Sequence, residues 1–313
     1  MSGGNYDGVS RIAVIGAGTI GASWAAYFLS RGLDVSASDP APGAHDRIRR
    51  FIDAAWSALQ SLGLADGADP TRLTFDPDPA AAAEGTHFVQ ESGPDRAEIK
   101  QALLQRFAPA IDARVIIASS SSNLMPSQIQ ANCPHPERVV VGHPFNPPHL
   151  IPLVEVCGGA QTDPAVVERA VAFYRAIGKH PIRLNKEMPG HVSNRLQAAI
   201  WREAAYLVAE GVVDVADVDA AVAQGPGIRW ALMGPALTHH LGGGEGGLRY
   251  LWHSFGPAIL WPHLGAPDND PALLDRLVEG VEQEAKGRSM AEWASWRDRK
   301  LVDILKTLRT DEP

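Results

Sequence analysis

The segment RIAVIGAGTIGASWAAYFLSRGLDVSASD, residues 11–39, contains the clearest structural information in this chain of 313 residues. The apolar run RIAVI predicts a strand that leads directly into the glycine-rich turn GAGTIG, residues 16–21. Residues 23–31 carry apolar side chains at helical spacing, and residues 33–38 predict a second strand, which Asp39 closes. A strand, a G-x-G-x-x-G turn, a helix, a strand and an acid in this order are typical of a dinucleotide-binding unit.

Each part of this unit has a physical role toward a dinucleotide. Gly16 allows the tight turn, Gly18 lets the backbone approach a pyrophosphate, and Gly21 lets the helix pack close to the strand. The start of the helix offers free N–H groups and a partial positive charge to the phosphates. Asp39 can accept hydrogen bonds from the adenosine ribose and would repel a 2′-phosphate, which favours NAD over NADP. The predicted cofactor-binding residues of this segment are Gly16, Gly18, Thr19, Ile20, Gly21 and Asp39.

A second informative segment is VVVGHPFNPPHLIPLVEVCGG, residues 139–159. Two apolar runs flank a proline-rich turn that is too short for a helical crossover, so we expect them to pair as antiparallel strands. This pairing brings Glu155 of the second run beside His143 at the end of the first. A carboxylate among valines and leucines is costly to bury unless it has a partner. A histidine held by a carboxylate is a common general base, so the two residues predict a catalytic pair.

Serines follow another predicted strand, residues 115–119. They place hydroxyl groups at the carboxyl edge of the sheet, which is where open α/β sheets bind their ligands. A helix-capping run is the alternative interpretation, and it explains Ser127 better than Ser122. The strand at residues 87–91 ends in Glu91, either as an ordinary strand end or as a carboxylate near the cofactor.

Composition excludes several classes of protein. The formal net charge is −8 and no basic block is present, which argues against binding to nucleic acid or to a membrane surface. The first ten residues are polar and glycine-rich, so we expect no signal peptide, and no apolar run is long enough to span a membrane. Neither the two cysteines nor the histidines have the spacing of metal ligands, so we predict no metal site and a cytoplasmic protein.

After a last predicted strand at residues 181–184, the rest of the chain is predicted to be helical. We therefore predict a Rossmann-type doubly wound α/β domain over residues 1–188 and a smaller all-α domain over residues 189–313. Residues 242–247 are glycine-rich but follow no strand, so they predict an interhelical loop. Arg229 and Trp230 are open to two interpretations, a buried structural anchor or a substrate contact. In the second case Arg229 would grip a carboxylate and Trp230 would wall the pocket or face a quaternary ammonium group.

Four motifs in this order resemble the 3-hydroxyacyl-CoA dehydrogenase superfamily. They are the glycine turn, SSSSNLMPS at residues 119–127, GHPFNPPHLIPLVEV at residues 142–156 and GHVSNRL at residues 190–196. Within the superfamily, SSSSNLMPS and NPPHLIPLVE resemble the short L-gulonate-type dehydrogenases, the family of the lambda-crystallins. FVQESGP, AFYRAIG and WREAAYLV resemble the L-carnitine-type dehydrogenases. The resemblance also implies a homodimer formed through the C-terminal domain.

The resemblance implies roles for several polar residues. His143 corresponds to the catalytic base and Glu155 to its partner. Ser122 and Asn194 match polar contacts to the reacting oxygen and the nicotinamide. Asn146 matches a residue that supports the site and is grouped with the substrate contacts.

Two further residues are assigned to the cofactor, and two features bear on the substrate. Glu91 matches an acid near the cofactor, and we add Lys100 to the predicted cofactor-binding residues.

The region between the second strand and Pro70 has no lysine cluster for a CoA phosphate, which weakens the acyl-CoA interpretation. Asn194 matches the gulonate and acyl-CoA enzymes better than the carnitine enzymes, where an acid is expected, so the substrate stays open.

The predicted activity is the reversible, NAD-dependent oxidation of a small L-3-hydroxy acid to its 3-oxo acid, with L-gulonate- or L-carnitine-type substrates. The main alternative is a 3-hydroxyacyl-CoA dehydrogenase acting on 3-hydroxybutyryl-CoA. A second alternative is a structural, crystallin-like protein that binds NAD without catalysis. The presence of both His143 and Glu155 argues against it, because a protein without catalytic activity has no need for an acid among valines.

Overall fold

The computed structural model of the chain describes residue 6, residues 8–255 and residues 271–310. Two compact units divide the chain. The first comprises Met1–Asn194 and Asp298–Lys306, and the second comprises Arg195–Arg297 and Thr307–Pro313. Residues 189–194, which follow the predicted domain boundary, are thus grouped with the first unit.

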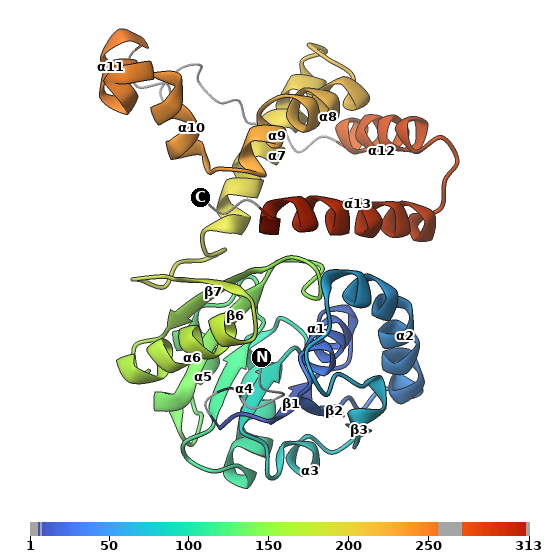
Figure 1. Cartoon of the computed structure of the whole chain (residues 1–313), viewed down its shortest axis with the longest axis vertical. Helices are drawn as coiled ribbons and strands as arrows, with labels where there is room; N and C mark the ends of the chain where they lie inside the picture. The colour runs from blue at the N-terminus through green and yellow to red at the C-terminus, as the bar shows by residue number, and fades with distance from the viewer. Residues whose placement is uncertain (1–5, 7, 256–270, 311–313) are drawn as a thin grey trace. The chain divides into compact units, whose positions relative to one another are not determined.

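The first unit is built on one eight-stranded sheet with the order β3-β2-β1-β4-β5-β6-β7-β8. Figure 1 labels β1, β2, β3, β6 and β7 of this sheet. All neighbouring strands are parallel except β6 and β7, which pair antiparallel as predicted. The order reverses between β1 and β4, and the glycine turn follows β1 at this switch point, where ligands of such sheets bind. The strands are β1 (Arg11–Ile15), β2 (Asp34–Ser38), β3 (Leu73–Phe75), β4 (Phe88–Glu91), β5 (Ile116–Ser119), β6 (Val139–Pro144), β7 (Leu153–Gly158) and β8 (His180–Arg183).

Helices cover both faces of this sheet, because the strands carry apolar residues on both sides. In β1, Ile12 and Val14 pack into one hydrophobic cluster with α1, α2 and α6. Ala13 and Ile15 pack into a second cluster with α3, α4 and α5. The helices are α1 (Thr19–Ser30), α2 (Ala44–Leu62), α3 (Pro79–Ala83), α4 (Ala97–Phe107), α5 (Pro126–Gln130) and α6 (Pro164–Ala176). The predicted doubly wound α/β fold is confirmed.

The glycine turn is under tight steric constraint at two of its three glycines. Gly16 has a positive φ of 99°, and a Cβ atom there would lie 2.6 Å from the backbone of Ser92 and Gly93. A Cβ atom on Gly21 would lie 1.8 Å from the carbonyl oxygen of Gly16. Gly18 has open space around it. Helix α1 includes the last three residues of the turn, so it begins four residues before the predicted start at residue 23.

The second unit contains only helices among the residues that the structure describes. Its small buried core consists of Val208, Val215 and Val218, with Leu207 and Leu277 packed against them. The helices from Ser193 onward are α7 (Ser193–Ala209), α8 (Val215–Gln224), α9 (Pro226–Trp230), α10 (Pro235–Gly242), α11 (Gly247–Phe255), α12 (Pro271–Ala285) and α13 (Met290–Thr310). A short 3₁₀ turn, Gly244–Gly246, links α10 to α11, so the predicted interhelical loop is confirmed. None of the helices in the described ranges is long and apolar enough to span a membrane.

Candidate active site

The glycine turn opens onto a cavity that suits a dinucleotide. The cavity has a volume of about 560 Å³, and its wall includes Gly16, Gly18 and Asp39 together with the apolar side chains of Ile99 and Leu103. No side chain caps the N-terminus of α1 and no acid lies in its first turn, so its N–H groups can accept an anionic phosphate. Apolar walls beside free backbone donors fit the adenine and the pyrophosphate of NAD.

Asp39 lies at the end of β2, on the wall of this cavity. Its carboxylate accepts hydrogen bonds of 2.9 Å from the backbone N–H groups of Ala17 and Ala41. These bonds tie the glycine turn to the loop after β2 and fix the acid where a ribose would approach. Its contact with the ribose hydroxyls stays a prediction.

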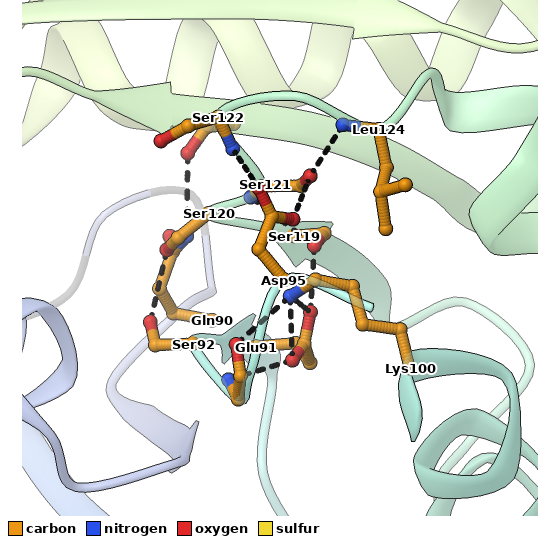
Figure 2. A network of polar contacts seen from close by, with 12 residues as sticks. Gln90, Glu91, Ser92, Asp95, Lys100, Ser119, Ser120, Ser121, Ser122 and Leu124 are labelled. Carbon is orange, nitrogen blue, oxygen red and sulfur yellow. Dashed lines mark hydrogen bonds and ion pairs between the residues drawn. The ribbon is translucent and has the colours of Figure 1, made fainter. Parts of the chain in front are cut away.

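Glu91 and Lys100 form a buried ion pair beneath the cavity wall (Figure 2). The side chains are 0% and 1% exposed, and the Lys100 Nζ atom lies 2.8 Å and 3.0 Å from the two carboxylate oxygens. Glu91 also accepts hydrogen bonds from the Gly93 N–H and the Ser119 hydroxyl. Neither residue lines the cavity, whereas residues 92–94 do. The pair therefore supports the loop at the cofactor site, and direct contact of either residue with NAD stays a prediction.

His143 and Glu155 meet across the antiparallel pair β6–β7. They are directly opposite each other in register, and the His143 Nδ1 atom lies 2.8 Å from the Glu155 Oε2 atom. The other carboxylate oxygen, Oε1, accepts hydrogen bonds from the backbone N–H groups of Val192 and Ser193, at 2.9 Å and 3.0 Å. The predicted contact between the histidine and the acid is confirmed.

The protonation state of Glu155 follows from these contacts. Burial is the largest single influence on its carboxyl group and raises the pKa. The hydrogen bonds from His143, Ser193 and Val192 act against burial, and the net pKa lies below its ordinary value of 4.5. Glu155 is thus an anion at neutral pH. It can only accept a hydrogen bond from Nδ1, which leaves Nε2 of a neutral His143 as the proton acceptor.

The Nε2 atom of His143 faces the end of β5. It lies 3.1 Å from the Ser122 hydroxyl oxygen. The Asn194 side chain donates a hydrogen bond of 3.1 Å to the Ser122 carbonyl oxygen. The four predicted catalytic residues, from the loop after β5, from β6 and β7, and from the start of α7, are therefore assembled in one place. A substrate hydroxyl that replaced the contact between Ser122 and His143 would meet a proton acceptor and a hydrogen-bonding hydroxyl together.

The three predicted substrate residues are all exposed. Asn146 is exposed in the loop after β6. Arg229 and Trp230 lie in α9 of the second unit, and both are exposed rather than buried anchors. Their contacts with a substrate stay predictions.

His191 is a site residue to which the sequence analysis assigned no role, although the motif GHVSNRL contains it. It is 1% exposed, and the centroid of its ring lies 5.1 Å from that of His143. Its Nε2 atom lies 3.0 Å from the Ser121 carbonyl oxygen. Burial is the main reason that its pKa lies below the ordinary 6.5. His191 is therefore neutral at neutral pH, and its ring adds no positive charge beside His143 when His143 is protonated.

Comparisons with known sequences agree with this geometry. The profile of the 3-hydroxyacyl-CoA dehydrogenase NAD-binding domain matches residues 11–188, and that of the C-terminal domain matches residues 190–292. The chain is 50% identical over 300 residues to an L-carnitine dehydrogenase of Streptomyces griseus, covering 95% of this chain and 90% of the relative. It is 45% identical over 302 residues to an L-carnitine dehydrogenase of Bacillus cereus, covering 96% and 93%.

Solved structures of dehydrogenases are also similar to the chain. An NAD⁺-dependent 5-formyl-3-hydroxy-2-methylpyridine-4-carboxylic acid 5-dehydrogenase, described as a dismutase, superposes with a TM-score of 0.83 at 32% identity. That match covers 97% of this chain and 100% of the other. The 3-hydroxybutyryl-CoA dehydrogenase of Escherichia coli K12 matches with a TM-score of 0.63 at 31% identity, over 74% of this chain and 49% of the other. The chain therefore belongs to the 3-hydroxyacyl-CoA dehydrogenase family and is an NAD-dependent dehydrogenase.

Proposed function

We propose that this enzyme oxidises L-carnitine to the corresponding 3-oxo acid. The observation that carries this proposal is the 50% identity, over nearly the whole chain, to the L-carnitine dehydrogenase of Streptomyces griseus. Asn194 points the other way, because an acid is expected there in carnitine enzymes. The identity extends over both matched domains and outweighs this single position.

Residues of this chain supply the acid–base chemistry. His143 accepts the proton of the C3 hydroxyl on Nε2, while its Nδ1–H stays hydrogen-bonded to Glu155. Bound NAD⁺ supplies the acceptor for the hydride that leaves C3. The Glu155 carboxylate stabilises the imidazolium that forms, and the Ser122 hydroxyl orients the reacting oxygen beside Nε2. In the reverse direction the imidazolium returns the proton to the oxygen of the 3-oxo acid.

Two side chains that are adjacent in the sequence, Arg229 and Trp230, have the chemistry to bind the two ends of carnitine. The substrate carries a carboxylate at one end and a trimethylammonium group at the other. Arg229 can bind a carboxylate with two parallel hydrogen bonds, and Trp230 can face a quaternary ammonium group with its ring. Both residues lie in α9 and both are exposed, which supports a role in binding.

The substrate is tested by a screen of NAD⁺ reduction, with the absorbance of NADH as the readout. L-carnitine, L-gulonate, 3-hydroxybutyrate and 3-hydroxybutyryl-CoA are compared, and D-carnitine is the stereochemical control. 3-Hydroxybutyrate lacks the ammonium group, whose contact with an aromatic ring contributes up to about 2 kcal/mol, so we expect its kcat/KM to be roughly 30-fold lower than that of L-carnitine. A higher kcat/KM for the CoA ester than for L-carnitine would instead support the acyl-CoA alternative.

We further propose a homodimer formed through the second unit. Large apolar side chains are exposed along its helices, and monomeric proteins rarely leave so many uncovered. They include Leu196, Ile200, Trp201, Leu232, Leu237, Leu241, Tyr250, Trp252, Leu274 and Val278. Light scattering of the full chain should give twice the monomer mass, and a monomer mass at micromolar concentration would refute the dimer. The free, buried Cys133 and Cys157 support a reducing, cytoplasmic location.

A further inference from the structure

The loop that carries Ser122, residues 121–123, is attached to the protein from two sides. On one side its carbonyl oxygens contact His191, which precedes α7, and Asn194 in the first turn of α7. The Ser121 oxygen lies 3.0 Å from His191 Nε2, and the Ser122 oxygen accepts a hydrogen bond from Asn194. On the other side its N–H groups point toward Asp95, which lies in the loop after β4.

Asp95 accepts four hydrogen bonds from this loop, some of which Figure 2 shows. Its Oδ2 atom accepts from the backbone N–H groups of Ser122 and Asn123, at 3.3 Å and 3.1 Å, and from the Asn123 side-chain amide at 3.3 Å. Its Oδ1 atom accepts from the Ser121 hydroxyl. The hydroxyl oxygen of Ser121 in turn accepts a hydrogen bond of 3.0 Å from the Leu124 N–H. One carboxylate thus organises every residue of the loop.

The segment that precedes Asp95 is held rigidly. The Gly93 N–H donates to Glu91 at 2.7 Å, and Lys100 donates to the Gly93 carbonyl oxygen at 3.1 Å. The Ser119 hydroxyl, at the end of β5, donates to the same Glu91 carboxylate at 2.6 Å. The two loops that Asp95 connects therefore start from one buried ion pair. Residues 92–94 also line the dinucleotide cavity.

We propose that Asp95 is a positioning residue that holds the Ser122 hydroxyl against Nε2 of His143. The inference rests on the proposed catalytic role of Ser122. Asp95 is itself exposed and acts through Ser122. When this carboxylate is replaced by a neutral amide, the N–H groups of Ser122 and Asn123 lose a charged acceptor, and the loop holds Ser122 less firmly against His143. A displacement of about 1 Å in a catalytic group can reduce turnover by up to about a hundredfold.

The test is a double-mutant cycle of Asp95→Asn with Ser122→Ala in the full-length enzyme. We expect Asp95→Asn to lower kcat by about tenfold or more while the Kd of NADH changes by less than about threefold. In the Ser122→Ala background the same substitution should lower kcat by no more than about twofold, because the hydroxyl that Asp95 positions is already gone. Asp163→Asn is the matched control, since Asp163 is also an exposed acid that accepts a backbone N–H, but at the start of α6. It should leave kcat unchanged.

Three outcomes would overturn the inference. The first is a wild-type kcat in Asp95→Asn. The second is that Asp95→Asn lowers kcat by the same factor in the wild-type enzyme and in Ser122→Ala. If Ser122→Ala alone keeps wild-type turnover, the proposed role of Ser122 fails and the inference fails with it. If Asp95→Asn does not fold, Ser121→Ala removes one donor to the same carboxylate. It should then lower kcat by about threefold, with the same dependence on Ser122.

Discussion

Replacing Glu155 by glutamine should prevent His143 from acting as the base, while a side chain of about the same size still fills the position. The carboxylate uses one oxygen to accept from His143 and the other to accept from two backbone N–H groups. Glutamine has one acceptor and one donor end. If its oxygen stays on the N–H groups of Val192 and Ser193, its amide nitrogen faces Nδ1 of His143. The histidine must then place its proton on Nε2, where it can no longer accept the proton of the substrate.

The size of the effect follows from the charge that is lost. Two unit charges about 4 Å apart attract each other by about 4 kcal/mol at an effective dielectric constant of about 20. At about 1.4 kcal/mol for each factor of ten in rate, loss of this attraction to the imidazolium corresponds to a decrease of about a thousandfold. Since the hydrogen-bond geometry is partly retained, we expect kcat for L-carnitine oxidation to fall by about 10² to 10³.

The assay is steady-state NAD⁺ reduction, with NADH binding measured separately by fluorescence titration. The Kd of NADH should change little, because Glu155 contacts the catalytic histidine and does not line the dinucleotide cavity. A variant with wild-type kcat would refute the argument that Glu155 sets the tautomer of His143 and stabilises its charge. Equal losses in kcat and in NADH affinity would indicate general damage to the fold.

The same substitution has a consequence for stability in acid. The pKa of Glu155 lies below its ordinary value of 4.5 in the folded protein. The ionised carboxylate therefore stabilises the native state above pH 4.5, and this stabilisation is lost as the pH falls through the lowered pKa. The free energy of unfolding of the wild type should fall more steeply between about pH 5 and about pH 3 than that of Glu155→Gln. The free energies of unfolding are measured by urea titration at each pH. The same pH dependence in the wild type and in Glu155→Gln would contradict the lowered pKa.

Further substitutions at Asp39, in the glycine turn and at the buried ion pair test the cofactor site and its support. Asp39→Ala should narrow the preference for NADH over NADPH, measured as the ratio of kcat/KM values; a wild-type enzyme that prefers NADPH would contradict the role of this acid. Gly21→Ala should lower the free energy of unfolding by about 1–3 kcal/mol, because a Cβ atom there meets the Gly16 carbonyl oxygen, whereas Gly18→Ala should keep the stability and weaken NAD binding. Equal stability of the two alanine variants in urea would refute the steric argument. Lys100→Met should destabilise the fold by about 3–5 kcal/mol by leaving Glu91 buried without its cation, and adding Glu91→Gln should recover much of the loss. A single variant as stable as the wild type would show that the pair contributes little.

The elements with local sequence patterns could be predicted. The dinucleotide unit is encoded within residues 11–39, since each of its parts follows directly from the one before. The contact between His143 and Glu155 was also predictable, because a short turn between two apolar runs fixes an antiparallel register. A buried acid in such a register has few partners within reach.

Contacts between distant loops could not be predicted in the same way. Asp95 is an exposed acid in a polar loop, and its partners follow a different strand. His191 is a second case, because it is buried with a positive φ of 50° and its ring contacts the Ser121 carbonyl oxygen, 70 residues away in the sequence. Glu91 and Lys100 were predicted to bind the cofactor, and only the structure shows that they form a buried ion pair with each other.

The proton-acceptor role of His143 is the claim on which the mechanism depends, and His143→Gln tests it most directly. The measurement is the single-turnover rate of NADH formation with saturating L-carnitine and NAD⁺, together with NADH affinity from fluorescence titration. We predict a rate at least about a hundredfold below that of the wild type, with NADH affinity essentially unchanged. A variant that forms NADH at the wild-type rate would contradict the assignment of His143 as the base.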